Sequence, residues 1–390
     1  MTLQSNITKL YFITALQWFM VLIPVIVLFY QENGLTLQEI FILQAFFSLI
    51  IVVFEIPSGY FGDVMSRKYS LLTGSILAFL GYLVYSISYG FWGFLGAEFL
   101  LGLGASFISG SDSAMLYDSL VELEKENKYK KYEGYIQSVK SLSEGIASIL
   151  GGFIAVISLR YTIYTQAIFL FLAIPLAFTL KEPKRQVFDN SEGNLKSIMK
   201  IVKYSVHDHA EVKWLIIYSA LIGASTFTVV WFIQPYFKLV GLPLAMFGII
   251  WALLQFSISF FSLFAHKYEE VLGRKLSLIS LVYYPVLGFI LVGIFQNLWA
   301  IVFIFLFYFT RAIQEPILKD YIHKLIPSEI RATVLSVRSL AMRIIFVIVG
   351  PYVGWIADVY TLSMAFYMSA GFFFVFGSIA LLFLHKNKAI

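Results

Sequence analysis

Charged side chains are unusual inside long apolar stretches of a sequence. Four of the carboxylates that lie in such stretches here are candidates for chemistry: Glu98, Asp112, Glu144 and Glu315. A charge at bilayer depth costs about 2.5 to 3.5 kcal/mol on insertion scales and usually faces a cavity or a partner. A carboxyl group in a poorly hydrated cavity can also take up and release protons near neutral pH. We therefore predict that each of these four residues is a candidate proton carrier.

Two of the carboxylates belong to a polar face of one apolar stretch. In residues 92 to 117, Glu98, Ala105, Ser109 and Asp112 recur with the 3.6-residue period of a helix. Small side chains allow close helix packing, so both carboxylates should point inward. This periodicity predicts one continuous helix with Asp112 as the deeper acid.

Cations in the apolar stretches offer partners for these acids. Tyr308, Arg311, Glu315 and Lys319 lie on adjacent helical turns. Arg311 and Glu315 could neutralise each other as an i,i+4 pair, or Arg311 could meet a substrate. Arg311 and Arg343 are expected to be the deepest cations.

The composition identifies the kind of protein that carries these charges. Of 390 residues, 59% are hydrophobic and only 13% are charged, against about 25% charged residues in soluble domains. The mean hydropathy is +0.82. The sequence therefore predicts an integral membrane protein. Cysteine is absent, which excludes disulfides and thiolate metal sites, and we expect no cofactor.

Twelve apolar runs are long enough to cross about 30 Å of hydrocarbon as helices. They fall at roughly 8–30, 37–60, 69–89, 92–117, 132–157, 162–180, 211–237, 244–265, 275–295, 298–319, 330–357 and 362–384. Runs this long and continuous exclude barrel strands. The first run is too long for a cleavable signal peptide and should stay in the mature chain. We predict an all-α membrane protein with six-helix bundles at 1–180 and 214–390 joined by a linker at 181–213.

The linker is the only long polar segment. Residues 195 to 202 place apolar side chains at helical spacing among lysines, which predicts an amphipathic helix on the membrane surface. The pair His207 and His209 lacks further ligands, as is typical of solvated histidines rather than of a metal site.

The net charge of +5 could suggest nucleic acid as a partner, but its distribution indicates a membrane instead. Basic residues concentrate in alternate loops, and the opposite loops hold only Arg160 and Lys238. This positive-inside pattern predicts that both termini lie in the cytoplasm. We expect membrane lipids, and no nucleic acid, as partners.

A charged turn at residues 59 to 68, with the sequence GYFGDVMSRK, separates the second and third apolar runs. Its Asp63 and Arg67 recur as Glu270 and Arg274, with an offset of 207 residues from Asp63 to Glu270. The two halves of the chain therefore share one plan.

A second repeat lies in the fifth and eleventh runs. Residues 138 to 142, SVKSL, return as SVRSL at residues 336 to 340, so that Lys140 and Arg338 are equivalent. Lys140 also lies one turn before Glu144, and it is the only local cation that could neutralise Glu144 or Asp112. These two cations could have a structural or gating role, or could contact a substrate.

The turn, of the form G-x3-D-x3-R-K, resembles the loop between helices 2 and 3 of the major facilitator superfamily, most closely its drug:proton antiporter branch. Members consist of two repeated six-helix halves with a site between them. The resemblance implies a cytoplasmic gate in which a charge cluster closes the inner side, with a weaker copy in the second half. The gate residues would be Gly59, Asp63, Arg67, Asp118, Lys140, Glu270, Arg274, Asp320 and Arg338.

The same resemblance implies which side chains line the cavity, because helices 1, 4, 7 and 10 of the family surround it with helices 5 and 11 beside them. The expected cavity residues are Gln17, Trp18, Ser109, Trp231, Gln234, Tyr308, Arg311 and Arg343. Two positions depart from the family's drug exporters. Glu98 replaces the usual arginine before a G-x-G-A step, and the proline of helix 5 is missing, while helix 11 carries Gly350-Pro351.

Together these features predict a secondary transporter that moves a small organic molecule across the bacterial inner membrane, coupled to protons. Export of an amphipathic compound, a drug or a siderophore-like metabolite, is the first hypothesis. Uptake of an anionic nutrient is the alternative, because of Arg311 and Arg343. No G-x-x-x-x-G-K-[ST] motif for ATP and no hydrolase or zinc motif occurs in the sequence, so an ATP-driven pump and an enzyme are not expected. The family default is a monomer.

Overall fold

The computed structural model describes residues 3–183, 209–327 and 330–387. In these ranges every regular element is a helix. Eleven helices within these ranges are long and apolar enough to cross a membrane, and a shorter apolar helix covers residues 23–32. The predicted all-α membrane protein is confirmed.

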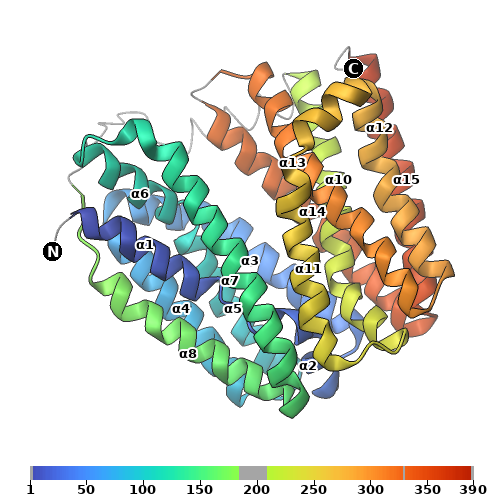
Figure 1. The fold of residues 1–390 in the computed structure, drawn as a ribbon, viewed down its shortest axis with the longest axis horizontal. Helices are drawn as coiled ribbons and strands as arrows, with labels where there is room; N and C mark the ends of the chain where they lie inside the picture. The colour runs from blue at the N-terminus through green and yellow to red at the C-terminus, as the bar shows by residue number, and fades with distance from the viewer. Residues whose placement is uncertain (1–2, 184–208, 328–329, 388–390) are drawn as a thin grey trace. The chain divides into compact units, whose positions relative to one another are not determined.

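The chain divides into two compact units. Unit 1 comprises residues 1–187 together with 243–255, and unit 2 comprises residues 188–242 together with 256–390. The elements of residues 1–187 are α1 (Leu3–Gln17), η1 (Ile23–Val25), α2 (Ile26–Glu32), α3 (Leu37–Val64), α4 (Arg67–Ile87), α5 (Phe91–Ile108), α6 (Ser111–Glu122), η2 (Glu126–Lys128), α7 (Tyr129–Ile157) and α8 (Leu159–Phe178). Within unit 1, α4 packs against α5 and α8, and α1 lies beside α8 (Figure 1).

The second half of the chain contains α10 (Ala210–Leu239), α11 (Leu244–Ser262), α12 (Ala265–Ile294), η4 (Leu298–Ile304), α13 (Phe305–Leu325), α14 (Arg331–Val359) and α15 (Leu362–Lys386). The first part of α11 groups with unit 1. In unit 2, α12 packs on α13 and α15, while α10 packs on α14 and α15. Helix α14 continues through Pro351.

The predicted amphipathic helix at 195–202 and His207 lie outside the described residues. His209 caps α10 by accepting a hydrogen bond from Val212 N.

Glycines bring neighbouring helices into backbone contact inside unit 1. A Cβ atom at Gly104 on α5 would lie 2.9 Å from the carbonyl oxygen of Gly74 on α4. Real Cβ atoms do not approach oxygen so closely, so a larger residue would force the helices apart. The polar face of α5 is therefore positioned by a tight α4–α5 contact.

The first spanning segment is not the continuous helix predicted for residues 8–30. Helix α1 ends at Gln17, and regular structure resumes at η1. The backbone N–H of Val21, in the break, donates to Gln166 Oε1 on α8 at 2.8 Å. A Cβ at Gly151 on α7 would lie only 2.0 Å from the Val21 carbonyl oxygen. Irregular backbone is tolerated at membrane depth when protein groups satisfy it, and Gln166 and Gly151 supply that environment here.

The fourth spanning segment is also broken, so the prediction of one continuous helix over 92–117 is wrong. Helix α5 ends at Ile108, and Gly110 adopts φ +77°, a left-handed conformation that favours glycine. Helix α6 then starts at Ser111. The prediction that Glu98, Ser109 and Asp112 share one helical face fails for the same reason.

Candidate functional site

An acid–cation pair lies in unit 1 where α6 meets α7. Lys140 Nζ lies 3.4 Å from Asp112 Oδ2, and each side chain keeps 18% of its surface exposed. The same ammonium lies 5.5 Å from the centre of the Trp18 ring, within cation–π range. Asp112, Lys140 and Trp18 come from three segments far apart in sequence. The break after α1 carries Trp18 to this position, and the adjacent Gln17 donates to Ser75 Oγ at 3.2 Å.

The break before α6 explains why Asp112 can meet Lys140. Asp112 lies in the first turn of α6 and accepts a hydrogen bond from the N–H of Ser113 at 2.8 Å. A carboxylate is stabilised at this positive end of the helix dipole. Its second oxygen remains available to Lys140, whereas Ser109, which ends α5, is exposed. The turn at residues 109–110, not helical periodicity, therefore directs the Asp112 side chain toward Lys140.

Unit 2 contains a matching pair between α13 and α14. Arg338 Nη2 donates to Glu315 Oε2 at 2.6 Å, and Arg338 Nε donates to Ser219. Lys319 Nζ lies 2.8 Å from the other oxygen of Glu315. Lys140 and Arg338, equivalent in the sequence repeat, thus each bind a carboxylate on the preceding spanning segment. The sequence indicated Lys140 as a cation available to Asp112, but it did not indicate the equivalent pairing of Arg338 with Glu315.

Of the two alternatives for Arg311, a pair with Glu315 is not formed, because Arg338 and Lys319 occupy that carboxylate. Among the residues that the structure describes, none forms a hydrogen bond or ion pair with the Arg311 side chain, which is half-buried. Arg343, which lies on α14 like Arg338, is also half-buried. The guanidinium of Arg311 could therefore bind an anionic ligand.

The remaining expected cavity residues of unit 2 lie on α10 and α13. Trp231, Gln234 and Tyr308 are buried, with 7%, 1% and 2% of their surfaces exposed. Trp231 packs edge-on against Phe227, and within the described ranges its indole N–H has no acceptor. An unused buried donor is unfavourable and would be satisfied by a polar group of a ligand.

Glu144 has a partner that sequence patterns did not indicate. Its Oε1 accepts a hydrogen bond from Gln255 Nε2, at the end of the α11 segment that belongs to unit 1. A second close contact lies nearby on the same two helices, where a Cβ at Gly248 would lie 2.0 Å from the carbonyl oxygen of Ser148. The small residues let α7 and α11 approach closely enough for this hydrogen bond.

Glu98 lies in a polar cluster of its own. Its Oε1 accepts hydrogen bonds from Tyr30 at 2.8 Å, Tyr85 at 2.7 Å and Gln44 at 2.6 Å. Only 4% of the Glu98 surface is exposed. The sequence could not link these four residues, because they come from four different helices. Glu98 and Asp112 are therefore bound by different partners rather than arranged along one stripe.

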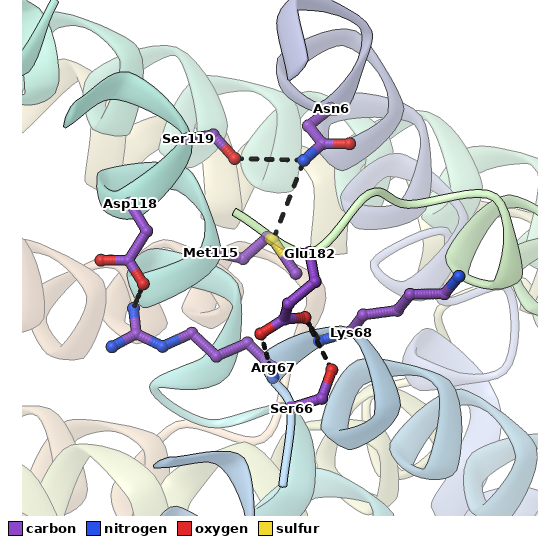
Figure 2. A network of polar contacts seen from close by, with 8 residues as sticks. All are labelled: Asn6, Ser66, Arg67, Lys68, Met115, Asp118, Ser119 and Glu182. Carbon is purple, nitrogen blue, oxygen red and sulfur yellow. Dashed lines mark hydrogen bonds and ion pairs between the residues drawn. The ribbon is translucent and has the colours of Figure 1, made fainter. Parts of the chain in front are cut away.

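Two of the residues expected in the gate of unit 1 form an ion pair between α4 and α6. Arg67 Nη1 lies 2.7 Å from Asp118 Oδ2, with 19% of each side chain exposed (Figure 2). Gly59 and Asp63 lie in the last turns of α3, just before this pair, and the side chain of Asp63 lies outside the described part of the structure. Sequence analysis missed Glu182, which accepts hydrogen bonds from Ser66 Oγ and from the backbone N–H groups of Arg67 and Lys68.

The copy of the gate in unit 2 is arranged differently. Glu270, Arg274 and Asp320 line one cavity of about 570 Å³. Arg274, however, lies 3.9 Å from Glu211 and stacks over the Tyr321 ring at 4.4 Å, while Asp320 pairs with Lys324 at 2.6 Å. Arg274 and Asp320 thus share a cavity but bind other partners, and the expected copy of the Arg67–Asp118 pair is not formed.

A further cation, Arg160, was assigned only to a loop by the sequence. Its guanidinium donates to Asn33 Oδ1 at 2.7 Å and to the carbonyl oxygens of Ser86 and Ser88 at 3.0 and 3.3 Å. It also stacks on Tyr89 at 4.0 Å. Arg160 therefore joins the start of α8 to the ends of α2 and α4.

Replacing Arg160 by alanine is expected to destabilise unit 1 by about 2 kcal/mol, because four hydrogen bonds from a charged group are lost together. Thermal unfolding of the purified protein in detergent measures this effect. Arg160→Lys, which keeps the charge but not the planar fork, should recover only part of the loss. An unchanged unfolding temperature in Arg160→Ala would contradict this assignment.

Comparison with known proteins agrees with the geometry. The model of the Major Facilitator Superfamily matches residues 9–349. The Quinolone resistance protein NorA of Staphylococcus aureus (strain MRSA252) is 22% identical over 289 residues, covering 72% of this chain and 71% of that protein.

Solved structures of transporters share the fold. The nucleoside transporter NupG superposes with a TM-score of 0.80 at 13% identity, covering 98% of this chain and 99% of NupG. A D-xylose-proton symporter superposes with a TM-score of 0.72 at 15% identity, covering 97% of this chain and 95% of the symporter. The chain is thus a multi-pass membrane transporter of small molecules, not an enzyme, and it belongs to the Major Facilitator Superfamily.

Proposed function

We propose that this protein is a proton-coupled secondary transporter that exports an amphipathic compound, such as a drug or a siderophore-like metabolite. The observation that carries the proposal is the repeated pair of an acid and a cation, Asp112 with Lys140 and Glu315 with Arg338. The likeness to a quinolone resistance protein supports export. We place the protein in the bacterial inner membrane as a monomer with both termini in the cytoplasm.

Proton coupling follows from the chemistry of the pair in unit 1. Protonation of Asp112 removes the charge that holds Lys140, and the ammonium is then free to move. Loss of the proton restores the pair, so each protonation state favours a different position of α7 relative to α6. Glu315 would act in the same way on Arg338, while Glu98 and Glu144 offer further proton sites within unit 1.

Alternating access then requires a gate that distinguishes the two open states. We assign this role on the cytoplasmic side to the Arg67–Asp118 pair, with Gly59 and Asp63 in the turn before it. The pair would latch the outward-open state, and Glu270, Arg274 and Asp320 would form the looser half of the gate. Rocking of one half against the other is the motion expected for this superfamily.

Proton movement in liposomes tests the proposal directly. Liposomes containing the purified protein and a pH-sensitive dye would be given an imposed pH gradient and a panel of ethidium, benzoate and a neutral amphipathic dye. Proton movement evoked by ethidium or the neutral dye supports antiport of an amphipathic compound. Liposomes without protein are the control, and the absence of any response beyond theirs across a wide substrate panel would count against proton coupling.

The second candidate is a proton-coupled importer of an anionic nutrient. It is favoured by Arg311, which has no partner among the described residues. In the same assay, a response to benzoate alone would support this candidate. Substitution of Arg311 by glutamine should then abolish the response.

Glu144→Gln tests one proton site on its own. Glutamine keeps an acceptor for the hydrogen bond from Gln255 but cannot ionise. If Glu144 carries a coupled proton, transport should lose its dependence on the pH gradient while exchange down the substrate gradient continues. Glu39→Gln provides a control, since Glu39 is an acid whose side chain caps the start of α3. Unaltered coupling in Glu144→Gln would leave the role to Asp112, Glu98 or Glu315.

A further inference from the structure

Glu182 follows α8 and binds the N-terminus of α4 (Figure 2). Ser66 Oγ donates to Glu182 Oε2 at 2.6 Å, the N–H of Lys68 to the same oxygen at 3.0 Å, and the N–H of Arg67 to Oε1 at 3.1 Å. The first N–H groups of a helix have no intrahelical acceptor, and the helix dipole favours a negative charge there. Both oxygens of one carboxylate therefore fix the backbone from which Arg67 extends.

A buried asparagine connects this cap to the other side of the gate. Asn6 Nδ2 donates to the carbonyl oxygen of Lys181 at 2.7 Å and to Ser119 Oγ at 3.2 Å, while its Oδ1 accepts from the N–H of Lys181 at 3.0 Å. Lys181 precedes Glu182, and Ser119 follows Asp118. Asn6 thus fixes the position of Glu182 relative to Asp118. Figure 2 shows Asn6 bound to Ser119 and, nearby, Glu182 bound to residues 66 to 68.

The sequence repeat provides an internal comparison. At the offset of 207 residues, Gly273 stands where unit 1 has Ser66, and it adopts φ +72°. The following Arg274 is bound to Glu211 and Tyr321 rather than to Asp320. The half that has the serine and the Glu182 cap forms its arginine–aspartate pair, and the half with glycine at that position does not.

We propose that Glu182 is a positioning residue of the gate. By holding the backbone of residues 66 to 68, it directs the Arg67 guanidinium to Asp118 and so increases the strength of the latch. This inference rests on the gate assigned under the proposed function. It adds a residue at the start of the connection between the halves, which the resemblance to the family did not include.

Hydrogen exchange on the full-length protein in detergent tests the cap itself. In Glu182→Gln, the amides of Arg67 and Lys68 should exchange roughly tenfold faster, because two hydrogen bonds to a charged acceptor are weakened. Glu126→Gln removes an exposed carboxylate from the nearby η2 and should leave these amides unchanged. Unchanged exchange at Arg67 and Lys68 in Glu182→Gln would overturn the proposal.

A double-mutant cycle separates positioning from a general structural role. Unfolding temperatures would be measured for Glu182→Gln, Asp118→Asn and the double variant. A second cycle, with Glu126→Gln in place of Glu182→Gln, is the matched control. If Glu182 acts through the Arg67–Asp118 pair, the double variant should lose clearly less than the sum of the single losses. Additive losses would refute it. If Glu182→Gln fails to fold, Ser66→Ala replaces it, because this change removes one hydrogen-bond donor to Glu182. The same cycle with Asp118→Asn then tests whether the cap acts through the Arg67–Asp118 pair.

Neither measurement needs a substrate or a pH gradient. Coupling between Glu182 and Asp118 without any proton movement in liposomes would retain the positioning role and reject the proton-coupled function. Where ethidium transport is observed, Glu182→Gln should lower the maximum rate and leave the KM for ethidium unchanged, because Glu182 acts on the gate. A raised KM at an unchanged maximum rate would contradict the proposal.

Discussion

Replacing Asp112 by asparagine is expected to abolish the accumulation of substrate that a pH gradient drives. Asparagine preserves the shape of the side chain and its hydrogen bond from the N–H of Ser113 but removes both the proton site and the charge that binds Lys140. One pH unit corresponds to about 1.4 kcal/mol for each coupled proton, or up to roughly tenfold accumulation. The accumulation ratio should fall to about one, while exchange of substrate without a gradient continues.

The measurement is the steady-state ratio of ethidium across liposomes with and without a pH gradient. Glu133→Gln is the matched control, because Glu133 also lies where α6 meets α7 and accepts a hydrogen bond from Ser113 Oγ at 3.3 Å. No cation pairs with it among the described residues, so its substitution should leave accumulation intact. Gradient-driven accumulation at the wild-type level in Asp112→Asn would assign coupling to another carboxylate.

Breaking the Arg67–Asp118 pair is expected to produce the second large effect. Because both side chains are mostly buried, Asp118→Asn leaves the guanidinium of Arg67 without its 2.7 Å partner. Partial exposure reduces the cost, and a loss of about 1 to 2 kcal/mol corresponds to a roughly tenfold shift between open states. The transport rate should fall by about that factor, with expression little changed.

Charge exchange provides the control for this prediction. In the double variant Arg67→Asp and Asp118→Arg, the ion pair can form again with its polarity reversed, so part of the transport rate should return. Each single change should be as slow as Asp118→Asn or slower. Equal transport rates in all variants would show that the pair does not latch the gate. If the single variants are slow and the double variant does not recover, the gate requires the arginine on α4 and the aspartate on α6, not only an ion pair between them.

The sequence alone determined the fold class, because the bilayer sets the length of a spanning helix and hydropathy reports that length directly. The half-length repeat likewise predicted that Lys140 and Arg338 are equivalent, and the turn at 59 to 68 marked Arg67 as important. These conclusions need only local composition and spacing. The family match over residues 9–349 confirms the superfamily that the turn and the repeat indicated.

The tertiary structure decided where the chain departs from regular helices. The break after Gln17 depends on Gln166 and Gly151, which lie more than a hundred residues away in sequence. The turn at Gly110 moves Asp112 off the face that periodicity assigned to it. Periodicity assumes an unbroken helix, so it fails wherever a distant side chain satisfies the backbone in place of the helical hydrogen bond.

Partners of the charged residues were decided in the same way. The sequence offered Lys140 as the one local cation for either Asp112 or Glu144, and the structure pairs it with Asp112. A pair of Glu315 with Arg311 was one of two alternatives, and the structure pairs Glu315 with Arg338 instead. The only feature of Glu182 visible in the sequence is that it is an acid just after the sixth apolar run. Its function as a cap depends on the position of α4 in the fold. Sequence spacing determines which residues share a helix, whereas the contacts between helices determine which charges meet.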